Sequence, residues 1–303
     1  MRKRIYRSDK AGVGPGEEGA GSHSRPSAHL AAAGVRPSKG RGQNFLVQAA
    51  IAERIVAMAQ LGRDDEVIEI GPGLGILTGR ILDHPIRVLR LIELDSRLAA
   101  QLRERFGGVA NLEIIEADVL EFDLAGAIER PPVKILGNLP FNVAAAVLRK
   151  LSDYRQFIAR MVLMFQREVA DRIRAHPDEP DYAALSVYTA LDWEIERHFR
   201  VDAGSFHPRP KVDAEVLLFT ARTHPVCDDA ERERVIEVIR AGFSSPRKMV
   251  RNNLSVALEI PPAQVQTALE RAYIDTRARA EALSVLDFVR LARCLNRDRA
   301  TAE

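Results

Sequence analysis

The 303-residue sequence has only two cysteines, no long apolar run and little net charge. Each of these features excludes a class of site or of protein. Cys227 and Cys294 stand far apart and outside any metal-ligand spacing, so neither a disulfide framework nor a metal site is expected. A reducing compartment, the cytoplasm, is then the default location. Because no run of about 18 apolar residues occurs, we also expect no membrane span.

The net charge of +2 is distributed unevenly along the chain. Residues 1–43 hold nine Lys or Arg and three Asp or Glu, a net charge of +6, which leaves −4 for the rest. Any contact with nucleic acid must therefore come from local patches or from this tail. Residues 1–38 are rich in Gly, Ser, Pro, Arg and Ala, a composition that predicts a disordered basic extension.

Strand and helix patterns alternate through most of the chain, which indicates βαβ units and a mostly parallel sheet of the α/β class. Apolar patterning predicts seven strands, over 66–70, 88–94, 112–117, 133–136, 160–165, 193–199 and 212–220. It predicts helices between them over 48–60, 76–82, 97–106, 144–151, 168–175 and 182–191. From about residue 222 the pattern is all-helical, with helices over 235–243, 250–258, 263–271 and 285–295. We therefore expect an α/β domain over 39–221 and a small helical domain over 222–303.

A glycine-rich turn lies between the first strand and its helix. Gly71, Gly73 and Gly75 permit a tight turn and close approach of a ligand to the backbone. The next strand ends in Ile92-Glu-Leu-Asp95, which places Glu93 about 20 positions after the turn, the spacing of an acid that bonds ribose hydroxyls. Asp118 follows the third strand. Its carboxylate can accept a hydrogen bond from an adenine amine, or it can cap the turn that follows. The pattern predicts a nucleoside-binding site.

The tetrapeptide Asn138-Leu-Pro-Phe141 follows the fourth strand, at the edge where ligands bind in open α/β folds. The Asn138 side-chain oxygen and the Leu139 carbonyl oxygen can each accept a hydrogen from a substrate amine. Pro140 stiffens the turn, and Phe141 can stack on a flat base. Such a site suits adenine, whose delocalised amine is a poor nucleophile and needs positioning more than a general base. By itself, however, the tetrapeptide is also a common turn former.

Several motifs together resemble the ribosomal RNA adenine dimethyltransferases, the KsgA group, from Lys39 to Leu295. The matching stretches are Gly42-Gln-Asn-Phe-Leu46, Glu69-Ile-Gly-Pro-Gly-Leu-Gly75, Ile92-Glu-Leu-Asp95, Gly137-Asn-Leu-Pro-Phe141, Gln166-Arg-Glu-Val169 and Phe206-His-Pro-Arg-Pro-Lys-Val212. The resemblance implies a Rossmann-like methyltransferase fold that binds S-adenosylmethionine.

The resemblance also implies a role for individual residues. Those expected to bind the cofactor are Asn44, Leu46, Gly71, Glu93, Asp118 and Asn138. Those expected at the reaction centre are Asn138, Leu139, Pro140, Phe141 and Phe206, with the two phenylalanines sandwiching a flipped base.

Features of the C-terminal half favour the branch that dimethylates two adjacent adenosines of small-subunit 16S rRNA. They are Gly242-Phe-Ser-Ser-Pro-Arg-Lys-Met-Val-Arg-Asn-Asn-Leu254 and Arg279-Ala-Glu-Ala-Leu-Ser284, which resemble the rRNA-docking domain of that branch. Arg247, Lys248 and Arg251 are the expected RNA-binding residues, although the same pattern fits a solvated helix face. We expect a monomeric enzyme whose partner is the small ribosomal subunit.

Three other functions remain open from the sequence. An Erm-like enzyme would methylate large-subunit 23S rRNA, and a ribosome assembly or transcription factor would bind RNA without catalysis. A pure binder would not need the set Glu93, Asp118 and Asn138. An NAD-dependent dehydrogenase would share the glycine turn and the acid but has no use for Asn138-Leu-Pro-Phe141.

Overall fold

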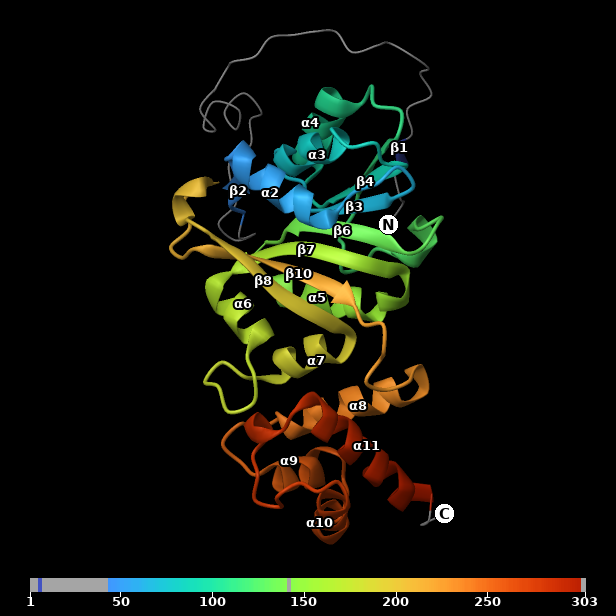
Figure 1. The fold of residues 1–303 in the computed structure, drawn as a ribbon, viewed down its shortest axis with the longest axis vertical. Coiled ribbons are helices and arrows are strands. Elements are labelled where there is room, and N and C mark those ends of the chain that lie inside the picture. The colour runs from blue at the N-terminus through green and yellow to red at the C-terminus, as the bar shows by residue number, and fades with distance from the viewer. Residues whose placement is uncertain (1–4, 7–42, 141–142, 301–303) are drawn as a thin grey trace. The chain divides into compact units, whose positions relative to one another are not determined.

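The computed structural model describes residues 5–6, 43–140 and 143–300 (Figure 1). The chain forms two compact units. The first comprises Met1–Arg167 and Glu196–Thr220, and the second comprises Glu168–Ile195 and Ala221–Glu303. Each unit has its own hydrophobic cluster, so each is described separately.

The first unit is built on one large sheet with the strand order β1-β5-β4-β3-β6-β7-β10-β8. Its strands are β1 (Ile5–Tyr6), β3 (Glu66–Ile70), β4 (Val88–Glu93), β5 (Leu112–Glu116), β6 (Val133–Asn138), β7 (Ile158–Gln166), β8 (Trp193–Val201) and β10 (Ala214–Ala221). The strands β5, β4, β3, β6 and β7 are parallel, and β10 joins β7 antiparallel. The predicted α/β class with a mostly parallel sheet of seven strands is confirmed.

An eighth strand, β1, pairs antiparallel with β5, opposite Ile114 and Ile115. Its two residues lie inside the segment 1–38, for which the sequence predicts disorder. Residues 1–4 and 7–38 are outside the described part of the chain. A strand of two residues is too short to show an alternating pattern. It exists through pairing with a partner more than 100 residues away in the sequence, which local patterning cannot reveal.

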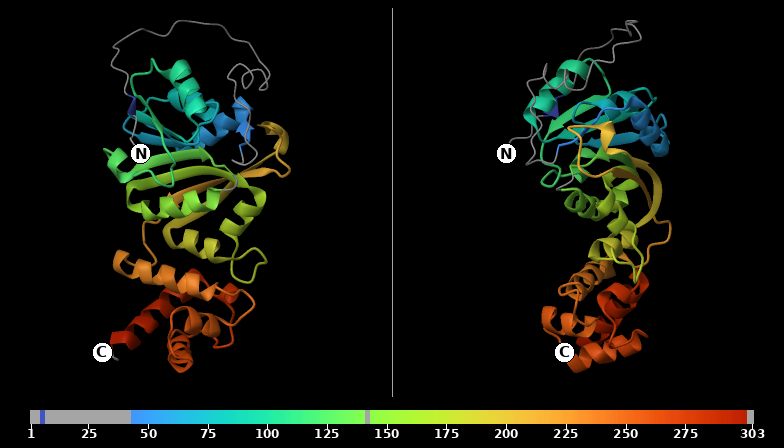
Figure 2. Two further views of the ribbon diagram at one scale, coloured as in Figure 1. Left: turned by 180° about the vertical axis from the view of Figure 1, so that it is seen from behind. Right: turned by 90° about the vertical axis from the view of Figure 1, so that its left-hand side faces the viewer.

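Helices cover both faces of the sheet. On one face, alternate strand residues pack with α2 (Ala49–Ala59), α3 (Ile76–Leu82) and α4 (Ser96–Phe106) in a single cluster. That alternation follows from the two-residue repeat of a strand, as with Leu89 and Leu91 or Val162 and Met164. The helix α5 (Ala144–Asp153) is in view on the sheet seen from behind (Figure 2).

The second unit is helical. It holds α6 (Arg167–Arg174), α7 (Ala184–Asp192), α8 (Asp229–Gly242), α9 (Val250–Ala257), α10 (Pro262–Arg271) and α11 (Val285–Ala300). The helix α8 begins six residues before the predicted start at 235, because the Asp228 carboxylate caps it by accepting from the Glu231 backbone N–H at 2.7 Å. Phe288 is fully buried in the hydrophobic cluster of this unit, and its ring stacks on Phe243.

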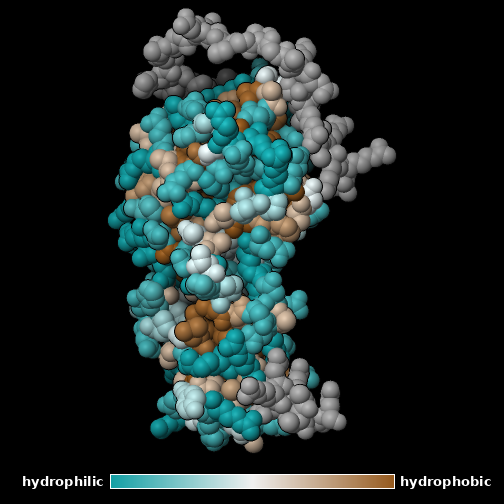
Figure 3. All heavy atoms as spheres, turned by 45° about the vertical axis from the view of Figure 1, so that its right-hand side comes forward, coloured by the Kyte–Doolittle hydropathy of each residue, from teal (hydrophilic) through white to brown (hydrophobic). Residues whose placement is uncertain are grey.

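None of the helices in the described residues is long and apolar enough to cross a membrane. Hydrophilic residues cover most of the face shown in Figure 3, with small apolar patches between them.

Candidate functional site

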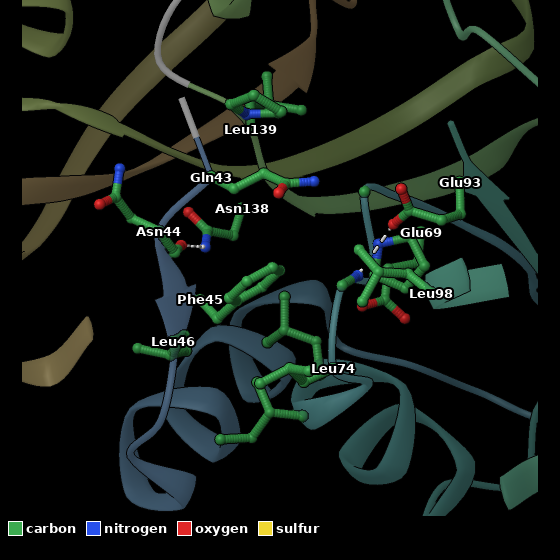
Figure 4. A pocket seen from close by; sticks show the side chains of 16 residues that line it. Gln43, Asn44, Phe45, Leu46, Glu69, Leu74, Glu93, Leu98, Asn138 and Leu139 are labelled. Atoms are coloured by element: carbon green, nitrogen blue, oxygen red, sulfur yellow. Dashed lines mark hydrogen bonds between the residues drawn. The ribbon is translucent and has the colours of Figure 1, made fainter. Parts of the chain in front are cut away.

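A cavity opens at the carboxyl ends of β3, β4 and β6 (Figure 4). It lies wholly within the first unit. The residues that line it come from four places: the segment 43–46, the turn and helix start at 71–74, 76 and 77, the tip of β6 at 138–140, and the side chains of Glu69, Glu93 and Leu98. The predicted residues Asn44, Leu46, Gly71, Glu93 and Asn138 therefore meet at one cavity.

The glycine turn depends on glycine for conformation and for space. Gly71, Gly73 and Gly75 have φ values of 65°, 56° and 74°, which side-chain-bearing residues rarely adopt. A Cβ on Gly73 would lie 2.9 Å from the Phe45 ring, and one on Gly75 would lie 2.8 Å from the Phe106 ring. The turn therefore packs directly against its neighbours and leads into α3.

The Glu93 carboxylate braces the glycine turn from the tip of β4. It is buried, and its two oxygens accept hydrogen bonds from the backbone N–H groups of Gly73 at 3.1 Å and Asp95 at 2.9 Å. Burial raises the pKa of the Glu93 carboxyl, while these backbone donors act in the opposite direction. The residue stands where an acid can receive the hydroxyls of a ribose.

A second buried carboxylate, Glu69, faces the same cavity and was not predicted as a site residue. It accepts a hydrogen bond from the Thr78 hydroxyl at 2.7 Å. Burial raises the pKa of Glu69 to about 8, and the charge of nearby Glu93 adds to this. The sequence signal that could have identified Glu69 is its position in the strand directly before the glycine turn.

The charged residues of the lining bear on which ligand the cavity suits. Among the described residues that line it there is no Lys or Arg. The anionic pyrophosphate of a dinucleotide would therefore have no basic side chain of this described lining to pair with. A nucleoside with a positive charge fits better, and S-adenosylmethionine carries positive charge on both its sulfonium and its amine.

Asn138 ends β6 and points its amide across the cavity toward the segment 43–46 (Figure 4). The Asn138 Nδ2 donates to the carbonyl oxygen of Asn44 at 3.0 Å, which leaves Oδ1 as the acceptor for a substrate. Just before it, Gly137 allows close packing of strands, because a Cβ there would lie 2.9 Å from the Ile70 carbonyl oxygen. Leu139 is buried and Pro140 also lines the cavity, whereas Phe141 lies outside the described residues.

Two predicted site residues are not among those that line the cavity in the described part of the chain. Asp118 follows β5, and its Oδ1 accepts from the Leu120 backbone N–H at 2.8 Å, as a turn cap does. Phe206 begins β9 (Phe206–His207), which pairs with β2 (Phe45–Leu46), and its side chain is only 3% exposed beside Leu46. The binding roles of both residues stay predictions.

The expected RNA-binding residues lie together in the second unit. Arg247 and Lys248 are exposed in the loop between α8 and α9, and Arg251 is half-buried in the first turn of α9. The Arg251 Nη1 donates to Gln266 Oε1 at 3.2 Å. Asn253, which the sequence did not single out, holds the loop by donating to the carbonyl oxygens of Gly242 and Ser245 at 2.6 and 3.0 Å.

Comparison with known proteins gives consistent matches. Residues 37–297 match the family model "Ribosomal RNA adenine dimethylase". The Ribosomal RNA small subunit methyltransferase A of Geobacter sulfurreducens is 38% identical over 266 residues, which cover 86% of this chain and 96% of the relative. The protein of the same name from Methylococcus capsulatus is 40% identical over 261 residues, covering 86% of this chain and 98% of the relative.

Two solved structures share the fold. A dimethyladenosine transferase from Plasmodium falciparum superimposes with a TM-score of 0.73 at 23% identity, covering 83% of this chain and 97% of that chain. The 23S rRNA methyltransferase ErmE superimposes with a TM-score of 0.63 at 28% identity, covering 84% of this chain and 100% of that chain.

Proposed function

The chain belongs to the ribosomal RNA adenine dimethylases, S-adenosylmethionine-dependent enzymes, and we propose that it dimethylates the N6 amines of two adjacent adenosines in a hairpin loop near the 3′ end of small-subunit 16S rRNA. One observation carries the proposal. A single cavity brings Asn138, with its Nδ2 engaged by the Asn44 carbonyl, together with the buried carboxylates Glu69 and Glu93. The cavity thus combines an acceptor for an amine with a site for a cationic nucleoside.

The chain's own residues would hold the cofactor by three kinds of contact. The Glu93 carboxylate would receive the ribose hydroxyls, and the turn at Gly71 and Gly73 would let the ligand approach the backbone. Glu69 would face positive charge, which favours its ionised form. When bound, S-adenosylmethionine supplies an electrophilic methyl group on a positively charged sulfur.

Asn138 and Leu139 would orient the substrate amine. Because Nδ2 of Asn138 is held by the Asn44 carbonyl oxygen, the Oδ1 atom has a fixed position from which to accept an N6 hydrogen. The Leu139 carbonyl oxygen would accept the other, which aims the amine lone pair at the methyl group. Positioning of this kind can lower a barrier by roughly 7–11 kcal/mol in favourable cases. The proton can leave after transfer, so no general base is needed.

The partner that follows from this proposal is the small ribosomal subunit, on which the protein acts as a monomer in the cytoplasm. The names of the relatives from Geobacter and Methylococcus, which refer to the small subunit, support this choice. The flipped target bases would meet the tip of β6, since a base cannot be methylated at N6 while it is stacked and paired.

The test is methylation of isolated small subunits from a strain that lacks the modification, with labelled S-adenosylmethionine and mapping of the labelled bases. We expect two dimethylated adenosines next to each other in one hairpin loop. Free large-subunit RNA is the parallel substrate, because the fold is shared with ErmE. Label on large-subunit RNA alone would contradict the small-subunit assignment, and no label on either RNA would contradict the enzymatic proposal.

A further inference from the structure

An exposed aromatic ring stands out in the second unit. Tyr273 is 91% exposed, more than the other large apolar residues found exposed in the described part of the chain, among which Val256 at 78% comes next. It follows α10, in the connection that leads toward α11. Its backbone φ of 60° lies in the left-handed region, which a residue with a side chain rarely adopts.

This backbone conformation belongs to the turn that ends α10. The Tyr273 N–H donates to the Glu270 carbonyl at 3.1 Å, and the Ile274 N–H donates to the Leu269 carbonyl at 2.9 Å. These two bonds form a Schellman turn in which Tyr273 occupies the position that favours glycine. Because the ring is almost fully exposed, packing within the chain does not offset the cost of a side chain there. Gln60, Asp178 and Glu259 also have a positive φ and are exposed, but Tyr273 is the aromatic residue among these four.

Arginines lie close to this ring in the sequence, and the acids Glu270 and Glu281 stand on either side of them. The segment 271–279 contains three arginines and one acid, and Arg277 is 87% exposed. Two ion pairs of this segment are long. Arg277 Nε lies 4.0 Å from Asp275 Oδ1, and Arg279 Nη1 lies 3.7 Å from Glu281 Oε1. Exposed pairs at such distances contribute little and leave the cations available to a partner.

The same segment lies beside the loop between α8 and α9. Arg279 forms a β-bridge with Met249, and the Val250 N–H donates to the Ala278 carbonyl at 2.9 Å. That loop carries Arg247 and Lys248, both exposed, and residues 244–251 contain no acid. The loop with Arg247 and Lys248 and the segment that follows Tyr273 therefore lie side by side at residues 249–250 and 278–279.

We propose that Tyr273 stacks on an unpaired base of the RNA substrate while the neighbouring arginines contact its phosphates. The choice of RNA rests on the proposed function and on the charge of these two segments. Aromatic stacking tolerates any base, because every base has a flat face, and cations around the ring follow the phosphate backbone.

The decisive variant is Tyr273→Gly, because it should make the folded protein more stable and at the same time weaken RNA binding. Glycine suits the left-handed turn, so the midpoint of thermal unfolding should rise. Loss of one stacked base should weaken binding to unmethylated small subunits about 5- to 150-fold. The salt dependence of binding should stay the same, since stacking releases no counterions. Tyr273→Phe should retain affinity, and Val256→Ala, which truncates another exposed apolar side chain in the same unit, should match the wild type.

A fluorescent variant gives a second readout. Trp193 is the single tryptophan and is fully buried, so Tyr273→Trp adds one exposed indole to a constant background. We expect this variant to bind small subunits normally and its added emission to be quenched on binding, as stacking on a base requires. An emission that does not change on binding would overturn the proposal.

Two further outcomes would also overturn it. Unchanged affinity in Tyr273→Gly would show that the ring contacts nothing in the complex. Weaker binding to intact subunits but unchanged binding to the protein-free RNA would identify a ribosomal protein as the contact. Methylation by the wild-type protein is measured alongside, so that failure of the proposed function itself is recognised separately from failure at Tyr273.

Discussion

At the scale of single residues, Asn138 offers the sharpest test of the mechanism. If its Oδ1 orients the substrate amine, Asn138→Ala should slow methyl transfer about 100-fold or more while RNA binding changes little. An interaction realised mainly in the transition state lowers the rate of chemistry and leaves affinity unchanged. Single-turnover methylation at saturating RNA and cofactor measures that step alone.

The matched variant is Asn138→Asp. It keeps an acceptor at nearly the same place but cannot donate to the Asn44 carbonyl as the amide does. It also adds a negative charge to a cavity that already holds Glu69 and Glu93. We expect slower chemistry with tighter cofactor binding. A near-normal single-turnover rate for Asn138→Ala would mean that this residue only shapes the turn.

Glu93 should govern affinity for the cofactor. Glu93→Ala removes charge-assisted hydrogen bonds worth about 1.5–3 kcal/mol each, so calorimetry should show S-adenosylmethionine binding at least 10-fold weaker. Glu116→Ala, which removes an exposed carboxylate at the end of the neighbouring strand β5, is the control and should bind normally. Unchanged affinity in Glu93→Ala would contradict the assignment of the cavity.

Asp118→Ala decides between two uses of one side chain. Its carboxylate already accepts from the Leu120 backbone N–H at 2.8 Å. We predict that it also receives the adenine amine, so that Asp118→Ala weakens cofactor binding in the same calorimetric assay. Unchanged cofactor affinity with a lower unfolding temperature would identify Asp118 as a turn cap only.

Glu69 should make stability depend on pH. Burial raises its pKa from an ordinary 4.5 to about 8, so between these values the folded chain keeps a proton that the unfolded chain loses. The free energy of unfolding therefore falls as pH rises through this window, at up to about 1.4 kcal/mol per pH unit, and the loss is complete above about 8. Glu69→Gln cannot titrate and should lose this slope. Denaturant unfolding of both proteins from pH 5 to 9 measures it, and parallel curves would contradict the prediction.

The residues that sequence spacing predicts are those tied to a local pattern. Gly71, Glu93 and Asn138 stand at strand ends, where the period of the pattern and the turn chemistry are readable, and all three line one cavity. Glu69 was missed because its importance comes from burial beside Glu93, which depends on neighbouring strands. The burial of Phe206 likewise depends on pairing with Leu46, a residue 160 positions earlier in the chain.

At the scale of elements, the loop between α8 and α9 should act through its charge. Replacing Arg247, Lys248 and Arg251 with Gln should weaken binding to small subunits and flatten its salt dependence, because each lost phosphate contact removes about 0.7–0.9 from the slope of log K against log salt. Cofactor affinity should not change, since the cavity lies within the first unit.

The control for this variant neutralises Arg63 and Arg130. Both are exposed and lie three residues before the parallel strands β3 and β6, at the edge of the sheet opposite to the cavity. Their replacement should leave the salt slope unaltered. If the loop variant has the same slope as this control, its three cations form only a solvated helix face.

The sequence predicts that a strand or helix exists much better than it predicts where that strand or helix begins and ends. The strands β3, β4, β5 and β6 are apolar runs bounded by turn residues, so patterning finds them within a few positions. The start of α8 was placed too late because its first turn is polar and only the Asp228 cap marks it. The two-residue strands β2 and β9 carry no periodic signal and exist through their pairing alone.

At the scale of the whole molecule, the two units are not consecutive in the sequence. Residues Glu168–Ile195 pack with Ala221–Glu303, although the composition changes to all-helical only near residue 222. Sequence patterning cannot reveal this, because it reads neighbours along the chain and the packing joins residues far apart. The expected domain limits at 39–221 and 222–303 remain a prediction that truncation can test.

A chain that ends at Ala221 retains the sheet and the cavity but deletes most of the second unit. Tyr182, Val187 and Leu191 would lose their cluster, and burial of each such side chain contributes about 1.5–3 kcal/mol. The Tyr182 hydroxyl would lose its hydrogen bond to the Leu283 carbonyl oxygen at 2.6 Å, and Asp192 would lose its ion pair with Arg232 at 2.8 Å.

We therefore expect the truncated chain to aggregate or to unfold at a markedly lower temperature, with any folded fraction still binding S-adenosylmethionine. A chain that begins at residue 39 is the control, since the composition of residues 1–38 predicts disorder, and it should unfold near the wild-type temperature. Cooperative unfolding of the 1–221 chain at the wild-type temperature would show that residues 168–195 are stable without the later helices.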